Sequence, residues 1–453
     1  MTADAAAAQG EAPRSIFGHP KGLYYLAFTE AWERFSYYGM TALVVLYMVN
    51  QLLLPGHVEN IAGFPAFRAG MEGIFGPLST QALASQIFGF YSGFVYFTPV
   101  LGGMIADRWM GQRNAVVLGA GLMCMGHLAM AFDQSFLIAL LLLIVGCGFL
   151  KGNISSQVGA LYPPADETRR VRGFAIYSMA INIGSALGPI LCGFLAQAYG
   201  WHVGFACAAL FIFCGLITYL VGYRHLPARV ARKQGESRKL TQAEWVRIGA
   251  LSAVMVITVF QSVAYFQSFN TSLVWIQQHV DLQLGGFTIP TPWFNAVDPI
   301  FSIMGVPFVF ALWQWQANRG GEPNDLSKIG IGAWMAAAAN LVLVVSILVS
   351  GGEPISPIWP FLYYGILGLA FLFYWPTLLA VVSRAAPAPV NATMMGFAFL
   401  TLFVTGIIMG WLGALYQQLT PATFWGVHAA IAACGGLAVL LFGGVVTRLL
   451  KSD

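Results

Sequence analysis

The sequence predicts an all-helical integral membrane protein with about twelve transmembrane helices in two six-helix bundles. The chain has 453 residues, of which 58% are hydrophobic and only 9% are charged, and its mean hydropathy is +0.71. Soluble domains carry about 25% charged residues, so a chain this apolar belongs in a bilayer. Helices are expected because an open sheet in lipid would leave backbone groups unpaired. With so few charges, a nucleic-acid-binding surface is excluded in spite of the sequence pI of about 8.7.

Apolar runs follow one another along the chain, and each is long enough to span the hydrocarbon core, which takes roughly 20 residues. The six runs of the N-terminal half lie near 22–52, 80–107, 114–132, 135–160, 171–198 and 202–223. The six of the C-terminal half lie near 245–279, 291–316, 329–350, 357–383, 393–416 and 422–449. The connection at 53–79 is the longest predicted external loop, and we expect it to pack over the external mouth.

Basic residues predict the orientation and the domain division. They fall in every second connection, as at Arg170 and Arg384, and they cluster in the central stretch 224–247. By the positive-inside rule, both termini and this stretch are cytoplasmic, which requires an even number of helices. We therefore predict a cytosolic tail at 1–21, a six-helix bundle at 22–223, a basic linker at 224–245 and a second bundle at 246–453. The linker's charge is explained by anionic lipid, so no site is assigned to it.

One face of the first predicted helix carries ionisable residues in the middle of an apolar run. Glu30, Glu33, Arg34 and Tyr37 are spaced at i, i+3, i+4 and i+7, which places them on one side of a helix. An ionisable residue near the bilayer centre costs about 2.5–3.5 kcal/mol, so this face is expected to line a polar cavity inside the bundle. Two carboxylates beside one arginine leave a surplus acid that can take up a proton. The alternative is a self-neutralising structural ion cluster.

A loop motif lies between the second and third predicted helices. The stretch from Gly103 through Asp107 and Arg108 to Arg113 resembles the loop motif G-x-x-x-D-R-x-x-G-x-R of the major facilitator superfamily. Glycines allow a tight turn and a close approach of helices. We interpret Gly103, Asp107 and Arg108 as a conformational latch at the cytoplasmic end, and not as a binding site.

Lys151 is a second ionisable residue inside an apolar run, on the fourth predicted helix. At 1.5 Å per residue, it lies about 15 Å from the cytoplasmic end of its helix, and Arg34 lies about 18 Å from the start of the first helix. The two cations therefore share a depth near the midplane, where they could clamp an anionic group such as a carboxylate. In the alternative interpretation, Lys151 neutralises Glu30 or Glu33 across helices.

Two polar side chains accompany these groups. Asn182 stands among apolar residues on the fifth predicted helix and requires hydrogen-bond partners, from a cavity or from a neighbouring helix. Tyr96 on the second helix offers a hydroxyl to a cavity or packs in the bundle.

The stretch from Glu30 to Gly39 resembles the ExxERFxYYG signature of the proton-dependent oligopeptide transporter family. The resemblance covers nearly the whole chain. It implies a major facilitator fold without a cofactor, and symport of di- and tripeptides driven by the inward proton gradient across the inner membrane. The implied partners are a small peptide, protons and the lipid bilayer, and we expect a monomer. The implied roles are carboxylate binding by Arg34 and Lys151 with help from Asn182, proton coupling by Glu30 and Glu33, and pocket lining by Tyr37, Tyr38 and Tyr96.

Three departures from the family set this chain apart. Bacterial members usually carry two extra helices between the halves, and 224–245 is too short to hold them. The family's helix 7 usually carries an acid where this chain has Phe266. Helix 10 usually carries a glutamate before a proline, but the segment ending at Pro376 is apolar or aromatic here.

Asp298 is the remaining acid of the second half that lies within an apolar run, at a place where the family tends to have Asn. It could pair with Lys151 or meet a cationic group of the substrate, or it could be a hydrated aspartate at a helix end. We therefore name Glu30, Glu33, Lys151 and Asp298 as candidates for proton coupling. Substrate-binding candidates in the second half are Asp298, Gln267, Tyr374 and Trp375, although aromatic residues at helical spacing are equally explained by packing.

The sequence thus predicts a proton-coupled symporter that imports di- or tripeptides or a peptide-like solute with a carboxylate. The alternatives are the same fold with an N-modified peptide or a non-peptide anion as substrate, an efflux antiporter, or a non-transporting receptor. Nothing in the sequence indicates an enzyme. The six cysteines lie in apolar segments without metal-ligand spacing, so no metal site is expected.

Overall fold

The structure of the chain is a computed structural model that describes residues 15–163, 166–227 and 239–451. These residues form an almost entirely helical molecule, so the predicted fold class is confirmed. In the described residues, twelve helices have 19 residues or more. Ten stretches are long and apolar enough to cross a membrane, and one of them joins α3 and α4. The ionisable first helix, α1, is not among the ten.

The elements follow the predicted runs closely. The N-terminal half contains β1 (Ser15–Ile16), β2 (His19–Pro20), α1 (Lys21–Tyr47), η2 (Met48–Leu52), η3 (Val58–Asn60), α2 (Phe64–Phe75), α3 (Thr80–Ile105), η4 (Ala106–Met110), α4 (Gly111–Ala129), η5 (Asp133–Ser135), α5 (Phe136–Ala160), α6 (Glu167–Tyr199), α7 (Trp201–Gly222) and η6 (Tyr223–His225). The C-terminal half contains α8 (Gln242–Phe266), η7 (Gln267–Phe269), α9 (Thr271–His279), β3 (Gln283–Leu284), β4 (Phe287–Thr288), η8 (Thr291–Trp293), α10 (Phe294–Ala317), α11 (Asp325–Ser350), α12 (Ile358–Ala385), η9 (Ala388–Val390), α13 (Asn391–Ala414), η10 (Tyr416–Gln418) and α14 (Pro421–Lys451). β1 pairs antiparallel with β2, and β3 with β4.

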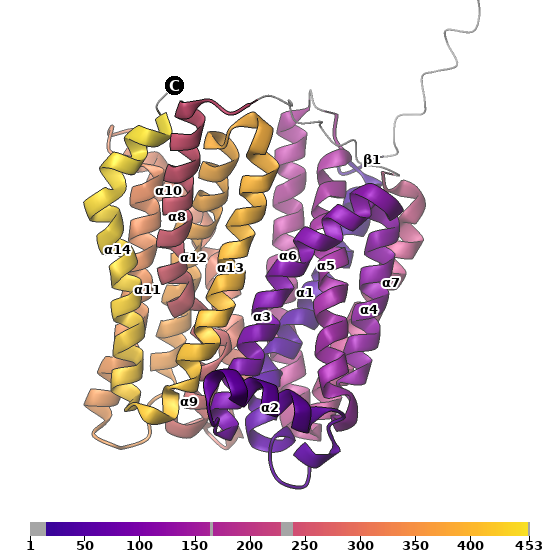
Figure 1. Cartoon of the computed structure of the whole chain (residues 1–453), viewed down its shortest axis with the longest axis vertical. Helices are drawn as coiled ribbons and strands as arrows, with labels where there is room; N and C mark the ends of the chain where they lie inside the picture. The colour runs from indigo at the N-terminus through magenta and orange to yellow at the C-terminus, as the bar shows by residue number, and fades with distance from the viewer. Residues whose placement is uncertain (1–14, 164–165, 228–238, 452–453) are drawn as a thin grey trace, which may run out of the picture.

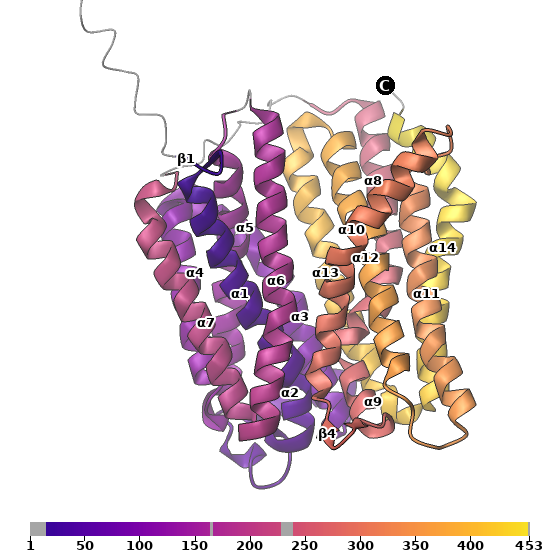
Figure 2. The same ribbon diagram turned by 180° about the vertical axis from the view of Figure 1, so that it is seen from behind.

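The two halves stand side by side, with α1–α7 in one and α8–α14 in the other (Figures 1 and 2). α1 begins and α14 ends at the same end of the molecule, which we call the termini end. The short helices α2 and α9 lie at the opposite end, which we call the α2 end.

The halves are joined at the α2 end. α3 crosses α13 there at four glycines, and a Cβ added at Gly89 would lie 2.6 Å from the Cα of Gly410. The hydroxyl of Ser79 donates to Gln417 across the halves at 2.6 Å. Small residues let helix backbones approach this closely. The described contacts therefore hold the two halves together on this side.

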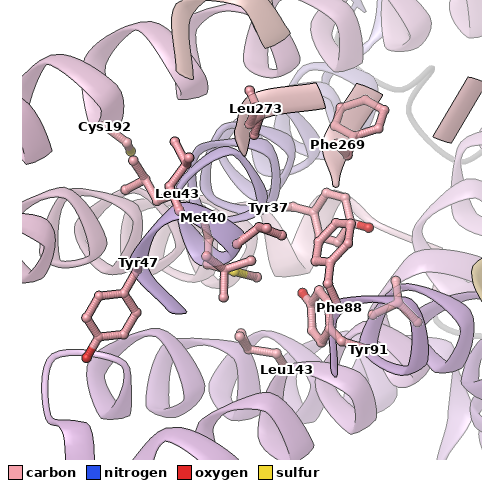
Figure 3. Close-up of a cluster of buried hydrophobic side chains, with 14 of the residues drawn as sticks. Tyr37, Met40, Leu43, Tyr47, Phe88, Tyr91, Leu143, Cys192, Phe269 and Leu273 are labelled. Atoms are coloured by element: carbon pink, nitrogen blue, oxygen red, sulfur yellow. The ribbon is translucent and has the colours of Figure 1, made fainter. Parts of the chain in front are cut away.

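The buried apolar core reflects the same division. One large cluster takes side chains from both halves, and Figure 3 shows Tyr37 and Met40 of α1 in it beside Tyr91 of α3 and Phe269 of η7. A second, separate cluster lies within the C-terminal half and includes Leu251 early in α8. The shared core thus links the halves, whereas part of the C-terminal half has a core of its own.

α1 is held in place by a close packing against α6. A Cβ at Gly184 would lie 2.2 Å from the carbonyl oxygen of Ala31, and one at Gly188 would lie 2.3 Å from that of Phe35. Only glycine fits at these two positions. This packing uses one side of α1 and leaves its charged side facing α3 and α5.

Two features of the fold differ from the sequence prediction. The connection 53–79 was expected as a loop, but it contains α2, which starts after Gly63 in the left-handed region (φ 76°) with a proline in its first turn. The run 245–279 was expected as one helix, but it breaks at Asn270, whose φ of −115° and ψ of −103° are not helical. The Oδ1 of Asn270 accepts a hydrogen bond from Ser85 at 3.1 Å, so a contact with the other half holds the break.

The described residues do not include the whole of the predicted tail and linker. Residues 1–14 of the tail and residues 228–238 of the linker lie outside them.

Candidate functional site

The charged face of α1 forms a buried cluster of one cation and two acids. The Nε of Arg34 lies 3.1 Å from Glu30 and also contacts Glu33. The three residues are 4%, 3% and 0% exposed, in that order. Among the described residues, Glu30 Oε2, Glu33 Oε1 and Arg34 Nη2 make no hydrogen bond. The two acids thus share the guanidinium, with Tyr177 of α6 beside Glu30. The cluster keeps unused hydrogen-bonding capacity, so it can take up a proton or a further polar group.

Lys151 of α5 lies next to this cluster without an acid of its own. Its Nζ lies 4.1 Å from the ring centre of Tyr96 and 5.7 Å from that of Tyr37. Within the described residues no carboxylate comes within 4.0 Å of it, so Lys151 makes no direct ion pair with Glu30 or Glu33. Each cation–π contact is worth roughly 0.5–2 kcal/mol, less than a well-placed anion would provide. Lys151 is half-buried, and it is the cation of the cluster that is most open to an anion.

Aromatic rings connect the cations to the C-terminal half. Tyr37 lies with its ring centre 5.5 Å from the Arg34 guanidinium and edge-on to Tyr38. Tyr38 contacts Phe269 at 5.9 Å between centroids, and Tyr96 contacts Phe266 at 6.1 Å. Tyr37, Tyr38 and Tyr96 are therefore brought together around Arg34 and Lys151.

The C-terminal half presents an aromatic wall, made of Tyr265, Phe266, Phe371, Tyr374 and Trp375. Tyr374 is fully buried, and Trp375 is half-buried. Phe266, a neutral ring, contacts Tyr96 at the position where the family resemblance implies an acid.

Asp298 of α10 is buried behind this wall. It is 4% exposed, so it is not a hydrated residue at a helix end. One carboxylate oxygen accepts a hydrogen bond from the hydroxyl of Tyr265. The other lies 3.4 Å from the hydroxyl of Ser302. In the described residues Asp298 forms no ion pair, with Lys151 or with any other cation.

Two predicted site residues are engaged elsewhere. Asn182 is half-exposed, and its side chain donates to the carbonyl of Ser178 one turn earlier in α6, at 3.0 Å. Gln267 is fully buried and donates to the carbonyl of Met409 at 3.0 Å, which ties η7 to α13. Neither side chain has a described contact with Arg34 or Lys151.

The loop motif lies at the termini end. Asp107 accepts a hydrogen bond from Gln112 of the same loop at 2.7 Å, and Asp107 and Arg108 are both exposed. A Cβ at Gly103 would meet nothing within 4 Å, whereas one at Gly102 would lie 2.2 Å from the carbonyl oxygen of Gly148 in α5. The close helix approach thus belongs to Gly102, which the motif alone does not single out.

Sequence reasoning also missed the roles of Tyr265 and Phe269. The bond from Tyr265 to Asp298 depends on how α8 is placed beside α10. Phe269 lies in η7, just before the unpredicted break at Asn270. No spacing in the sequence indicates either contact.

The fold and the paired halves define the class of protein. The family model described as Major Facilitator Superfamily matches residues 34–410. The chain therefore belongs to the major facilitator superfamily and is a multi-pass membrane transporter.

Within the superfamily, the chain is similar to peptide transporters of the proton-dependent oligopeptide transporter family, which confirms the resemblance. The "Uncharacterized transporter YclF" of Bacillus subtilis (strain 168) is 28% identical, with 97% of this chain and 96% of that protein covered. The "Peptide transporter YePEPT" of Yersinia enterocolitica subsp. palearctica is 27% identical, with 94% and 95% covered. A crystal structure of a mutant of the peptide transporter POT in complex with alafosfalin is 28% identical, with a TM-score of 0.84 and 97% and 98% covered.

The alignments also bear on the missing insertion. The match to the Bacillus subtilis protein extends over 497 positions, although this chain has 453 residues, so at least 44 of those positions have no counterpart here.

The matched proteins are transporters and not enzymes. In the described part of the chain, no group of three or more His, Cys, Asp or Glu is placed to hold a metal ion.

Proposed function

We propose that this protein is a proton-coupled symporter that imports a small peptide, or a peptide-like solute with a carboxylate, by alternating access. The observation that carries the proposal is the charge of the central cluster. Glu30 and Glu33 contribute two negative charges, and Arg34 and Lys151 contribute two positive ones, so the buried cluster sums to zero. Similarity to proteins named as peptide transporters supports the solute class.

A neutral buried cluster links the substrate to a proton. A substrate carboxylate adds one negative charge, and an uncompensated charge in such a site is strongly unfavourable. Uptake of one proton by Glu30 or Glu33 restores neutrality and at the same time loosens that acid's hold on Arg34. The carboxylate first meets Lys151, which has no acid partner among the described residues, and then Arg34 once the guanidinium is released. Proton and substrate therefore bind together.

The neighbouring side chains position the solute. In this proposal Tyr37, Tyr38 and Tyr96 line the carboxylate end, where their rings already surround the two cations. Asn182 can assist because it is half-exposed and is bonded only within its own helix in the described contacts. Gln267 contributes by holding η7 and Phe269 in place, and not by touching the solute.

The described contacts fit a conformation that is closed at the α2 end. If the termini are cytoplasmic, as the basic connections predict, that end faces the outside and transport proceeds toward the termini end. The latch residues Gly103, Asp107 and Arg108 lie at the termini end. There Asp107 accepts a hydrogen bond from Gln112 at the start of α4 and has no described contact with the other half.

A second candidate substrate class is favoured by one observation. Phe266 contacts Tyr96 where the family's helix 7 acid is expected, and the segment before Pro376, where the resemblance implies a glutamate that binds the substrate ammonium, is part of an aromatic wall. Aromatic surfaces bind apolar groups and do not require a charged amine. An N-blocked peptide or another carboxylate with an apolar end would then be carried as well as a free dipeptide.

Uptake into proteoliposomes with an imposed pH gradient tests the proposal. Alanylphenylalanine and its N-acetyl derivative are the probes, and a proton uncoupler is the control for the driving force. We expect accumulation of at least one probe that the uncoupler abolishes. Accumulation of the N-acetyl compound alone or equally supports the second class. Uptake of both probes that is indifferent to the pH gradient contradicts proton coupling.

A further inference from the structure

Asp298 has surroundings that differ from those of the other buried acids. Glu30 and Glu33 share a guanidinium, whereas the described partners of Asp298 are two hydroxyl groups, those of Tyr265 and Ser302. A carboxylate buried without a cation and with few donors is strongly disfavoured, and such a group takes a proton instead. The hydrogen bonds show which state fits.

A serine hydroxyl has one hydrogen to donate. Ser302 lies 2.9 Å from the carbonyl oxygen of Gly368 in α12 and 3.4 Å from Oδ1 of Asp298. Its hydrogen therefore goes to the carbonyl. Oδ1 is thus not stabilised as an anion, and Tyr265 alone donates to the carboxyl group, through Oδ2.

No cation of the packed helices lies near this group. α10 contains no Lys, Arg or His, and Asp298 is its one acid. On α8 the nearest cation is Arg247, 18 residues from Tyr265, which is about 27 Å along a helix. On α12 it is Arg384, 16 residues from Gly368, or about 24 Å. On α6, which also packs against α10, it is Arg172, 18 residues from Ile190, whose carbonyl accepts a hydrogen bond from Trp293, or about 27 Å along the helix. The ionisable groups that face Asp298 are tyrosines: Tyr265 of α8, Tyr363, Tyr364 and Tyr374 of α12, and Tyr38 of α1.

Two aromatic routes lead from the central cluster toward Asp298: Tyr38, which lies beside the two cations, also faces Asp298, and a chain of rings passes through Phe266. Tyr265 contacts Phe266, and Phe266 contacts Tyr96, which lies over Lys151. A phenyl ring neither donates nor accepts a proton, so the chain of contacts from Lys151 to Asp298 is not a hydrogen-bonded path. Among the described residues, no hydrogen bond or ion pair joins Asp298 to Glu30, Glu33 or Lys151, so the two groups of acids are distinct in their bonding.

We propose that Asp298 carries a proton in this conformation and that Asp298 with Tyr265 forms a second proton-carrying site, separate from Glu30, Glu33 and Arg34. Tyr265 is the positioning residue, because its hydroxyl fixes Oδ2. In each cycle Asp298 would take up a proton from one compartment, which forms the carboxyl O–H bond. When the halves rearrange and water reaches the acid, that bond would break and the proton would pass to water on the other side. This inference rests on the proposed proton-coupled transport and adds a second proton to it.

Infrared spectroscopy tests the protonation without any substrate. The C=O stretch of a protonated carboxyl group is separate from the bands of carboxylates and of the backbone. Wild-type protein in lipid at neutral pH is compared with Asp298→Asn, and Asp281→Asn, an exposed acid after α9, is the matched control. We expect Asp298→Asn to remove a protonated-acid band that the control keeps. An unchanged spectrum in Asp298→Asn overturns the proposal.

The proton-to-substrate ratio tests the function. It is measured as the substrate gradient that balances a known pH gradient at zero net flux, so a slower variant still reports it. With alanylphenylalanine or its N-acetyl derivative as probe, we expect Asp298→Asn to lower the ratio by one and Tyr265→Phe to shift the pH profile of driven uptake. An unchanged ratio in Asp298→Asn overturns this inference and leaves the proposed function intact. If the wild-type protein shows no proton-driven uptake, the proposed function is overturned. The infrared band still shows in that case whether Asp298 is protonated.

Discussion

The crossing of α3 and α13 gives the most quantitative prediction, because Gly89→Ala adds a single methyl group at a known contact. The new Cβ would lie 2.6 Å from the Cα of Gly410 and 2.7 Å from the carbonyl oxygen of Gly406. Real Cβ atoms do not come that close to backbone, so the two helices have to separate. Overpacking of this kind costs about 1–3 kcal/mol. At 1.4 kcal/mol per factor of ten, the conformation closed at the α2 end loses about 5- to 150-fold in population relative to one open there.

Spin labels at Ser79 and Gln417, which are in contact across the halves, report this change as a distance distribution. Gly121→Ala is the matched control, since it is a helical glycine of α4 whose added Cβ meets nothing within 4 Å. We expect a longer distance in Gly89→Ala and no change in the control. If Gly89→Ala keeps the wild-type distribution, the α3–α13 crossing is not what holds this end closed.

Four further predictions follow from the site and its packing. Arg34→Ala leaves two acids buried without their cation, so it should lower the free energy of unfolding by about 3–5 kcal/mol and abolish substrate accumulation. Thermal unfolding measures the first effect and proteoliposome uptake the second. Retained accumulation would refute the role of Arg34 in binding the substrate carboxylate. Lys151→Gln removes the cation that has no acid partner, so we expect a loss of about 2–4 kcal/mol of binding free energy for alanylphenylalanine. Calorimetry should then show binding that is about 30- to 1000-fold weaker, and unchanged affinity would contradict the assignment. Phe266→Ala removes an aromatic ring that a substrate side chain could contact, and such a contact is worth about 0.5–1.5 kcal/mol. The apparent KM for an aromatic peptide should therefore rise by about 2- to 12-fold, and the KM for alanylalanine should rise less. Gly184→Leu places side-chain atoms within the α1 backbone at Ala31, so we expect no folded protein by size-exclusion chromatography, and a monodisperse, active variant would show that α1 and α6 are not packed this way.

The sequence predicted the helices well because hydropathy is a property of single segments. The run at 135–160, for example, corresponds to α5 at Phe136–Ala160. The spacing of Glu30, Glu33 and Arg34 also placed them on one face, because helical geometry is local. The signature around these residues then indicated the right family.

Features that depend on two segments could not be predicted. The break at Asn270 lies in a polar stretch with Ser268, Thr271 and Ser272, but the contact that holds it is with Ser85, 185 residues away, and no local pattern indicates that contact. The bond from Tyr265 to Asp298 likewise needs α8 and α10 to be packed in register. The described partners of Asn182 and Gln267 could not be predicted either, because they depend on helix rotation: both side chains donate to backbone carbonyls, that of Asn182 within its own helix and that of Gln267 to Met409 of α13.

The link between a substrate carboxylate and a proton is tested most directly by counting protons at the moment of binding. Calorimetric titration of the purified protein with alanylphenylalanine or its N-acetyl derivative, repeated in buffers of different ionisation enthalpy, gives the number of protons taken up per solute bound. The neutral cluster of Glu30, Glu33, Arg34 and Lys151 predicts an uptake of about one proton by the wild-type protein, and none when Glu30 and Glu33 are both replaced by Gln. Tight binding by the wild-type protein with no proton uptake would contradict the account.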